Sequence, residues 1–175
     1  LLVIGNRFIM SGGFQFKSLF SPVIDEKTGA REAEEIVRAC EAMSDSHTGA
    51  LIVIGRKSNL VIYSEGGELI RARISSELLQ TIFFKNTPLH DGAVLIEGGH
   101  ILAARCPLPT TEQLTLPARY GMRHRAAIGM SERSDAIIVV VSEESGHISV
   151  FKTGEIRENI TPNELRNTLI SEKIF

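Results

Sequence analysis

Hydrophobic residues recur along this chain with two spacings, one typical of helices and the other typical of buried strands. From Arg31 the apolar positions lie three or four residues apart, which predicts an amphipathic helix that Gly49 ends. The runs 50–54 and 136–141 are apolar without interruption, as strands covered on both faces are. Because 136–141 is the richer in Val and Ile, we expect it to lie at the centre of the sheet.

Capping residues predict further helices. Either Ser75 or Ser76 caps a short helix that stops before Asn86. Another helix is expected near 118–130, after a loop rich in Pro and Thr. The segment 161–164 is a capping box with proline at the first helical position, and it opens a C-terminal helix.

Short turns join several of the predicted strands and leave no room there for helical crossovers. Hairpins interleaved with helices predict an α/β (α+β) fold, in which a single globular domain has a central mixed β-sheet flanked by helices. The expected hairpin pairs are 50–54 with 60–63, 93–96 with 101–104, and 136–141 with 148–151.

Composition narrows the class of protein. The chain has 175 residues, 43% of them apolar and 23% charged, which is typical of one soluble globular domain. A net charge of −2 and an aromatic content of 6% without Trp argue against a nucleic-acid partner. Cys40 and Cys106 match no metal or disulfide spacing, and we expect both to be small apolar fillers in a reducing compartment.

The start of the chain is expected to lie outside the domain. Residues 1–29 have weak periodicity, and we interpret them as a lead-in segment before a domain of residues 30–175. No apolar stretch reaches the roughly 20 residues that a membrane-spanning helix needs. Because the chain begins with Leu1 instead of Met, we expect it to be a piece of a longer protein.

A carboxylate stands directly before a predicted strand in the segment 86–93. Asp91 is followed by Gly92, which lets a ligand or another stretch of backbone come close. An aspartate in this place can orient a hydroxyl, act as a general base or bind a hard cation. It can also be the last residue of an ordinary turn.

Two further segments carry charges that suit phosphate and metal. Arg123-His124-Arg125 offers guanidinium groups, which fit phosphate oxygens, but helical side chains diverge by about 100° per residue, so at most two of the three can hold one phosphate. The segment 142–146, Ser-Glu-Glu-Ser-Gly, follows a strand at the end where ligands gather in α/β sheets. Taken alone, each segment is better explained as a solvated turn.

In combination, these segments resemble the diadenylate cyclase (DAC) domain family, which makes cyclic di-AMP from two ATP molecules. The Asp-Gly-Ala and Arg-His-Arg motifs at this separation are highly specific. The resemblance extends from about Arg31 to Thr153, and the arrangement is most similar to the membrane-anchored subclass. In that subclass transmembrane helices precede the domain, so the resemblance implies that residues 1–29 follow a membrane anchor that has been removed. The matching segments are 49–53, 75–79, 86–93, 123–127 and 142–146.

The resemblance implies that Asp91 is catalytic and helps to activate the ribose 3′-hydroxyl. Gly92 and Ala93 would bring the backbone close to the nucleotide, and Leu108 matches a position near adenine in this family. Mg²⁺ or Mn²⁺ is the implied cofactor. Its implied ligands are Asp91, His90 and Glu144. Glu144 is also an implied nucleotide-binding residue.

For the phosphates, the resemblance implies catalytic roles for Arg123 and Arg125, which would face the triphosphate, and for His124, which would shape that site. Ser142 would contact phosphate. Met122 departs from the family, where this position is often Thr, and its side chain offers a phosphate no hydrogen bond. This departure is the support for an alternative function, an adenine-nucleotide-binding sensor of the same fold with weak or no turnover.

The implied chemistry needs two copies of the domain, because each presents one ATP and the ring has two bonds. We therefore expect a homodimer with its sites face to face, and a membrane-bound or cytosolic regulator as a further partner. The resemblance places the full-length protein at the cytoplasmic face of the cell membrane, with this fragment soluble. A metal-dependent phosphohydrolase is a third reading, but the sequence lacks ligands enough for a two-metal site.

Overall fold

The two uninterrupted apolar runs form neighbouring strands in the middle of a seven-stranded sheet. The computed structural model describes residues 26–174. In chain order its elements are α1 (Glu26–Asp45), β1 (Ala50–Ile54), the 3₁₀ helix η2 (Val61–Tyr63), β2 (Glu68–Arg73), α2 (Ser76–Phe83), β3 (Ala93–Glu97), β4 (His100–Cys106), α3 (Met122–Arg133), β5 (Ile137–Val141), β6 (Ile148–Lys152), β7 (Glu155–Ile160) and α4 (Pro162–Ser171).

The sheet is mixed, as the hairpins predicted. Its strands follow one another in the order β2-β4-β3-β1-β5-β6-β7. Among these described strands, β1 and β3 run parallel and every other neighbouring pair is antiparallel. The strand expected at the centre is β5, but the middle place belongs to β1, with β5 beside it.

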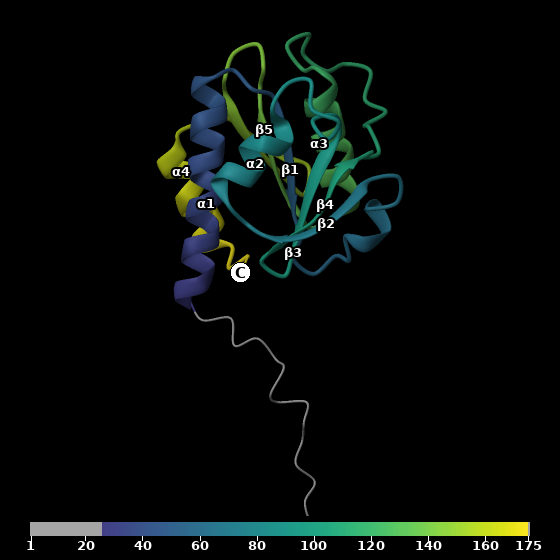
Figure 1. Cartoon of the computed structure of the whole chain (residues 1–175). Coiled ribbons are helices and arrows are strands. Elements are labelled where there is room, and N and C mark those ends of the chain that lie inside the picture. The colour runs from purple at the N-terminus through teal and green to yellow at the C-terminus, as the bar shows by residue number, and fades with distance from the viewer. Residues whose placement is uncertain (1–25, 175) are drawn as a thin grey trace, which may run out of the picture.

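Helices cover both faces of the sheet (Figure 1). Helices α1, α2 and α4 pack on one face, and α3 packs on the other. Along β1, Ile52 and Ile54 enter the core under α1, whereas Leu51 and Val53 enter the core under α3. Because both faces are covered, every position of the strand is apolar. The predicted α/β domain with a helix-flanked mixed sheet is confirmed.

Local capping signals were reliable. The Ser75 side chain accepts a hydrogen bond from the backbone N–H of Leu78 at 3.1 Å and caps α2. Thr161 and Glu164 form the predicted capping box of α4. Both signals involve residues within one helical turn, so the sequence alone determines them.

Several predicted elements need correction. Residues 61–63 form a 3₁₀ helix instead of a strand, and β1 pairs with β3 and β5. Val61 and Ile62 are exposed, and three apolar residues are too few to distinguish a strand from a turn. Helix α1 starts at Glu26, before the expected Arg31, and α3 starts at Met122, later than expected. Residues 1–25 of the expected lead-in lie outside the described residues.

The edge strands β2 and β7 were not predicted. Both carry mostly exposed side chains, so no buried apolar run marks them.

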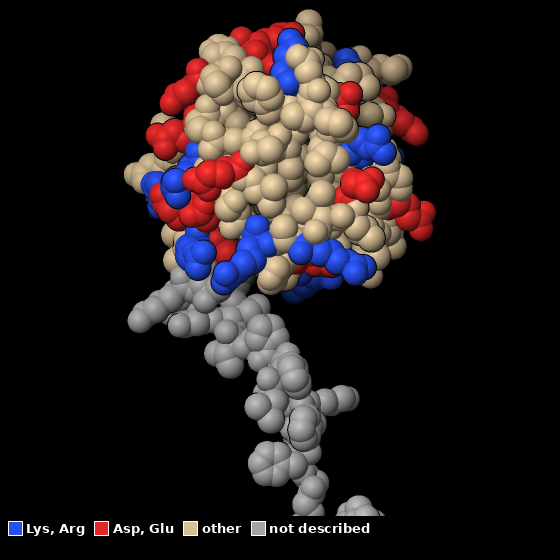
Figure 2. All heavy atoms as spheres, viewed as in Figure 1, with Lys and Arg blue, Asp and Glu red and all other residues tan. Residues whose placement is uncertain are grey.

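Acidic and basic side chains are interspersed on the face seen in Figure 2, around a central uncharged area. Within residues 26–174, no helix is long and apolar enough to cross a membrane.

The pairing register brings three chain segments to one end of the sheet. Ala50 pairs with Val141 in the antiparallel pair, and Ile52 pairs with Val94 in the parallel pair. The start of β1, the end of β5 and the start of β3 therefore lie together. The predicted segments 86–93 and 142–146 both meet the sheet at this end.

Candidate active site

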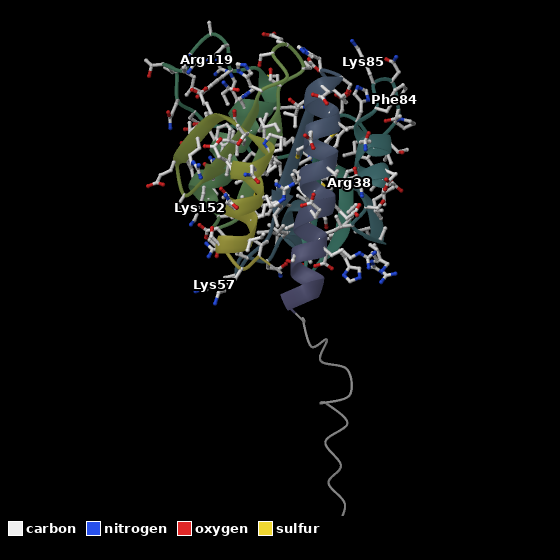
Figure 3. All side chains as sticks on the ribbon, turned by 90° about the vertical axis from the view of Figure 1, so that its left-hand side faces the viewer. Arg38, Lys57, Phe84, Lys85, Arg119 and Lys152 are labelled. Carbon is white, nitrogen blue, oxygen red and sulfur yellow. The ribbon has the colours of Figure 1, made fainter. Side chains whose placement is uncertain are left out.

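A cavity of about 400 Å³ opens at this end of the sheet, a size within the range of small-molecule sites. One of its lining residues, Arg119, lies at the opposite end of the molecule from Lys57 (Figure 3). The sequence-predicted residues that line it are Asp91, Gly92, Leu108, Met122, Arg123, His124, Ser142 and Glu144.

Asp91 stands in the loop before β3, with its carboxylate open to solvent. The side chain is 86% exposed. Gly92 follows with φ of +89°, and a Cβ there would stand 2.8 Å from the carbonyl oxygen of Cys106. Only glycine allows this approach between the loop and the end of β4. Ala93 is buried in register with Cys106, so it anchors the loop and is not among the cavity-lining residues.

His90 is oriented by the backbone of the same loop. Its Nδ1 donates to the carbonyl oxygen of Thr87 at 2.6 Å. Because a carbonyl only accepts, Nδ1 carries a proton, and in the neutral ring Nε2 keeps the lone pair. Nε2 lies 3.7 Å from Asp91 Oδ1. Two electron-rich atoms thus face each other, an arrangement that suits a shared cation.

The N-terminus of α3 points at the cavity. Gly121 provides no side-chain cap, so the first N–H groups of the helix and their partial positive charge are available to an anion. Met122 lines the cavity and is 73% exposed. Its thioether adds contact area but no donor at this helix end.

Arg123 leaves the first turn of α3 and lies over Gly49. Its Nη1 donates to Glu143 Oε2 at 3.0 Å. A Cβ at position 49 would overlap Nη1, so glycine is needed before β1 for the guanidinium to lie there. The Nε atom is buried and has no hydrogen-bond partner among the described residues. Arg123 is therefore held in place, and its Nε–H donor has no partner among the described residues.

The other two residues of the Arg-His-Arg motif differ from Arg123, because His124 lines the cavity only with a buried ring and Arg125 does not line it. His124 is only 8% exposed, with its ring stacked on Tyr120 at 5.1 Å and edge-on to Phe151 at 6.1 Å. Burial lowers the pKa of His124, which favours the neutral ring. Arg125 is not among the lining residues of the cavity. Helical geometry thus separates Arg125 from Arg123, as the angle between successive residues requires.

The loop 142–146 closes the cavity beside α3. The Ser142 hydroxyl accepts from the backbone N–H groups of Glu144 and Ser145, both at 3.3 Å, and keeps its own proton for a ligand. The loop is tied to the end of α1, because His47 Nδ1 donates to the carbonyl oxygen of Glu144 at 3.2 Å. Ser44 also donates to the carbonyl oxygen of Gly146 at 2.5 Å.

An apolar wall faces the polar groups. Leu108 lies in this wall, together with Leu51 and Cys106. Burial raises the pKa of the Cys106 thiol to about 11, so the sulfur is a neutral filler at neutral pH. The loop that carries Leu108 is held on α3 by the backbone N–H of Thr111, which donates to the carbonyl oxygen of Arg125 at 3.2 Å. Such a wall suits a flat base.

A second cavity, of about 520 Å³, adjoins the first. Asp91, Arg123 and Glu143 line both cavities, so they form the wall between them. The second cavity also contains the only other predicted site residue that lines a described cavity, His90, and it adds Lys85. The remaining lining residues are Ser46, His47, Thr48, Gly49 and Phe83.

The three expected metal ligands are not gathered in advance. Glu144 lines the first cavity and His90 the second, with Asp91 shared by both. Within residues 26–174, no group of three or more His, Cys, Asp or Glu side chains could hold a metal ion. Asp91 and His90 fit a divalent cation as a partial ligand set, because Mg²⁺ commonly takes one or two carboxylates and completes its shell with substrate phosphates and water.

Sequence reasoning missed Arg119 and Thr110, which also line the first cavity. The Arg119 guanidinium donates to both carboxylate oxygens of Glu158, at 3.2 and 2.8 Å. Those hydrogen bonds hold the pKa of Glu158 below its usual value. No signal in the sequence links the two residues, because Glu158 belongs to β7, an edge strand without an apolar pattern.

Comparisons with known proteins agree on one family. The profile described as "DAC: DisA bacterial checkpoint controller nucleotide-binding" matches residues 37–156. The chain is 41% identical over 147 residues to "Cyclic di-AMP synthase CdaA" of Bacillus subtilis, covering 84% of this chain and 54% of that protein. It is 43% identical over 141 residues to "Diadenylate cyclase" of Listeria monocytogenes, covering 81% and 52%. The chain thus spans about half the length of these relatives.

Two solved structures are similar to this chain in fold and sequence. DacA from Staphylococcus aureus, in a double-mutant crystal structure, has a TM-score of 0.79 and 39% identity, with 81% of this chain and 95% of that chain covered. A protein described as a hypothetical membrane spanning protein from Bacillus cereus has a TM-score of 0.67 and 40% identity, with 73% and 62% covered.

Proposed function

This chain belongs to the DAC family of diadenylate cyclase domains, and we propose that it condenses two ATP molecules into cyclic di-AMP with release of two pyrophosphates. One observation carries the proposal. A single cavity combines the exposed carboxylate of Asp91, the N-terminus of α3 with Arg123, and the hydroxyl of Ser142. These groups suit a hydroxyl that must attack and a phosphate that must be held.

In the proposed reaction, the ribose 3′-oxygen of one ATP attacks the α-phosphorus of the other. The new O3′–Pα bond forms as the bond from Pα to the bridging oxygen of pyrophosphate breaks, and the hydroxyl proton passes toward Asp91. Arg123, the free N–H groups of α3 and Ser142 neutralise and orient the phosphates. Catalysis of this kind depends mainly on positioning and charge neutralisation. Repeating the step closes the ring.

A divalent cation fits this scheme as the cofactor. Asp91 and His90 would hold Mg²⁺ or Mn²⁺ together with phosphate oxygens, and Glu144 would join them from the neighbouring loop. When bound, the cation supplies charge neutralisation on the phosphates. His124 contributes indirectly in this proposal, since its buried ring fixes the turn from which Arg123 extends.

Two copies of the domain are required, because each holds one ATP. The exposure of Asp91 supports a face-to-face homodimer, since a second nucleotide can reach the carboxylate from solvent. In the longer natural protein, we propose, the domain lies at the cytoplasmic face of the membrane. The Bacillus cereus relative described as membrane spanning supports that placement.

Incubation of the chain with ATP and Mn²⁺, followed by chromatography and mass spectrometry, tests the proposal. We expect cyclic di-AMP and pyrophosphate. ADP or AMP alone would indicate a phosphohydrolase instead. Tight ATP binding without any product would indicate a nucleotide sensor, the alternative that Met122 favours because it offers the phosphates no donor.

A further inference from the structure

The wall between the two cavities contains an ion pair whose partners are held very differently. Arg123 is 21% exposed, lies against Gly49 and keeps its buried Nε without a partner among the described residues. Glu143 is 63% exposed and extends from the turn after β5. The guanidinium of Arg123 is therefore fixed, whereas the carboxylate of Glu143 is free to move away from it.

The strength of the pair points the same way. An exposed ion pair with one hydrogen bond contributes little, because water and salt screen it and ordering two side chains opposes it. A phosphate carries more charge than a carboxylate and accepts several hydrogen bonds at once from a guanidinium. A phosphate group that reached Arg123 would displace Glu143 at small cost and would meet a guanidinium already in place.

We infer that Glu143 is a positioning residue that holds the place of an ATP phosphate on Arg123 until the nucleotide displaces it. The inference rests on the proposed function and extends it. When Glu143 leaves, the wall opens and the first cavity joins the second. The triphosphate then has a path from the α3 N-terminus toward Lys85 and His90, which line the second cavity.

The inference separates ligands by whether they carry a phosphate. ATP must displace Glu143, so removal of this carboxylate favours ATP binding. Adenosine has no phosphate to place on Arg123 and would bind against the apolar wall alone, so its affinity should not depend on Glu143. A residue with a merely structural role would change the affinities for both ligands together.

The test is calorimetric titration of the whole chain with ATP and with adenosine, in EDTA so that no product forms. For Glu143→Gln we expect ATP binding about two- to five-fold tighter, the range that an exposed ion pair spans, and unchanged adenosine binding. The matched control is Glu155→Gln, which removes the same charge from an exposed residue at the opposite end of the sheet. It should leave both affinities unchanged.

A double-mutant cycle separates place-holding from plain charge repulsion. In an Arg123→Ala background, Glu143→Gln should increase the ATP affinity by less than half of the free-energy gain that it brings when Arg123 is present. The reason is that no guanidinium is left for the substitution to release. An equal gain with and without Arg123 would overturn the inference, as would a Glu143→Gln chain of normal melting temperature that binds ATP no tighter. A wild-type chain that binds no ATP would instead overturn the proposed function.

Discussion

The two ends of the sheet hold aspartates in opposite surroundings. At the end away from the cavities, Asp135 precedes β5 and is saturated with donors. It accepts from the backbone N–H groups of Lys57 at 3.2 Å and Ser58 at 2.9 Å, and from the Ser58 hydroxyl at 2.6 Å. Although partial burial opposes it, these hydrogen bonds hold the pKa of Asp135 below its usual value.

At the cavity end, Asp91 is almost fully exposed, and His90 Nε2 lies 3.7 Å from its Oδ1. Arg123, beside it, keeps an unpartnered Nε among the described residues. The contrast teaches which polar groups stabilise the fold and which are left for a ligand. A carboxylate whose oxygens all accept hydrogen bonds within the protein stabilises the fold, whereas a carboxylate at a cavity without such partners can still bind a ligand.

The same substitution at the two ends tests this contrast, and the larger effect is expected at Asp91. Asp91→Asn should lower cyclic di-AMP synthesis by ~10²-fold or more, because it would remove both the proposed base and a proposed metal ligand. The melting temperature should stay unchanged, since the carboxylate is exposed. Steady-state rates and thermal unfolding measure the two quantities. A folded variant within a few-fold of normal turnover would remove Asp91 from catalysis.

Asp135→Asn should show the reverse pattern. It replaces a charged acceptor of three hydrogen bonds, and we expect a loss of about 1–3 kcal/mol in the free energy of unfolding. Turnover per folded molecule should stay normal. Chemical denaturation with activity assays below the transition measures both. If Asp135→Asn instead lowered turnover without lowering stability, the assignment of the two ends would be reversed.

Met122→Thr should sharpen the description of the cavity end. Its exposed thioether would be replaced by a hydroxyl beside the free N–H groups of α3. A hydrogen bond to a charged phosphate contributes about 1.5–3 kcal/mol, so ATP binding should tighten by roughly ten-fold once lost packing is offset. Calorimetry with Mn²⁺ measures it. Equal or weaker binding at unchanged stability would mean that position 122 does not face the phosphates.

The smallest expected effect concerns the buried ring of His124. Burial lowers its pKa below the ordinary 6.5, so the unfolded chain binds a proton that the folded chain does not. The stabilisation is complete above pH 6.5 and is lost as the pH falls from 6.5 through the folded pKa. His124→Phe keeps a ring between Tyr120 and Phe151 without the titration.

Thermal unfolding at pH 7.5 and pH 5.0 compares wild type with His124→Phe. Wild type should lose more stability on acidification, by less than about 1.4 kcal/mol per pH unit, the limit for one proton. An equal loss in both chains would show that the pKa of His124 does not differ between the folded and the unfolded chain.

How far the sequence predicts this molecule depends on the distance over which each feature is determined. Capping by Ser75 and Thr161, and the hairpin of β3 and β4, depend on neighbours in the chain and were predicted. The edge strands β2 and β7 are held by pairing with distant strands, so their exposed side chains carry no local pattern.

The candidate site shows the same limit. The segments around Asp91 and Ser142 were found because polar residues interrupt apolar runs, and the structure brings them to one cavity. The burial of His124 and the pairing of Arg123 with Glu143 depend on helix rotation and on contacts across the fold. Of the three basic residues in the motif, Arg123 and the buried His124 therefore line the first cavity, and Arg125 lines neither cavity.

The most direct test of the account is cyclic di-AMP synthesis measured across a dilution series of the chain, with Mn²⁺ and saturating ATP. In the proposed mechanism each copy supplies one exposed Asp91 and holds one ATP, so the ring would close only where two copies meet. We predict that product formed per unit of enzyme falls as the chain is diluted through its dimer dissociation constant. Specific activity that stays constant from high micromolar to low nanomolar enzyme, with a monomer confirmed by sedimentation, would contradict the account.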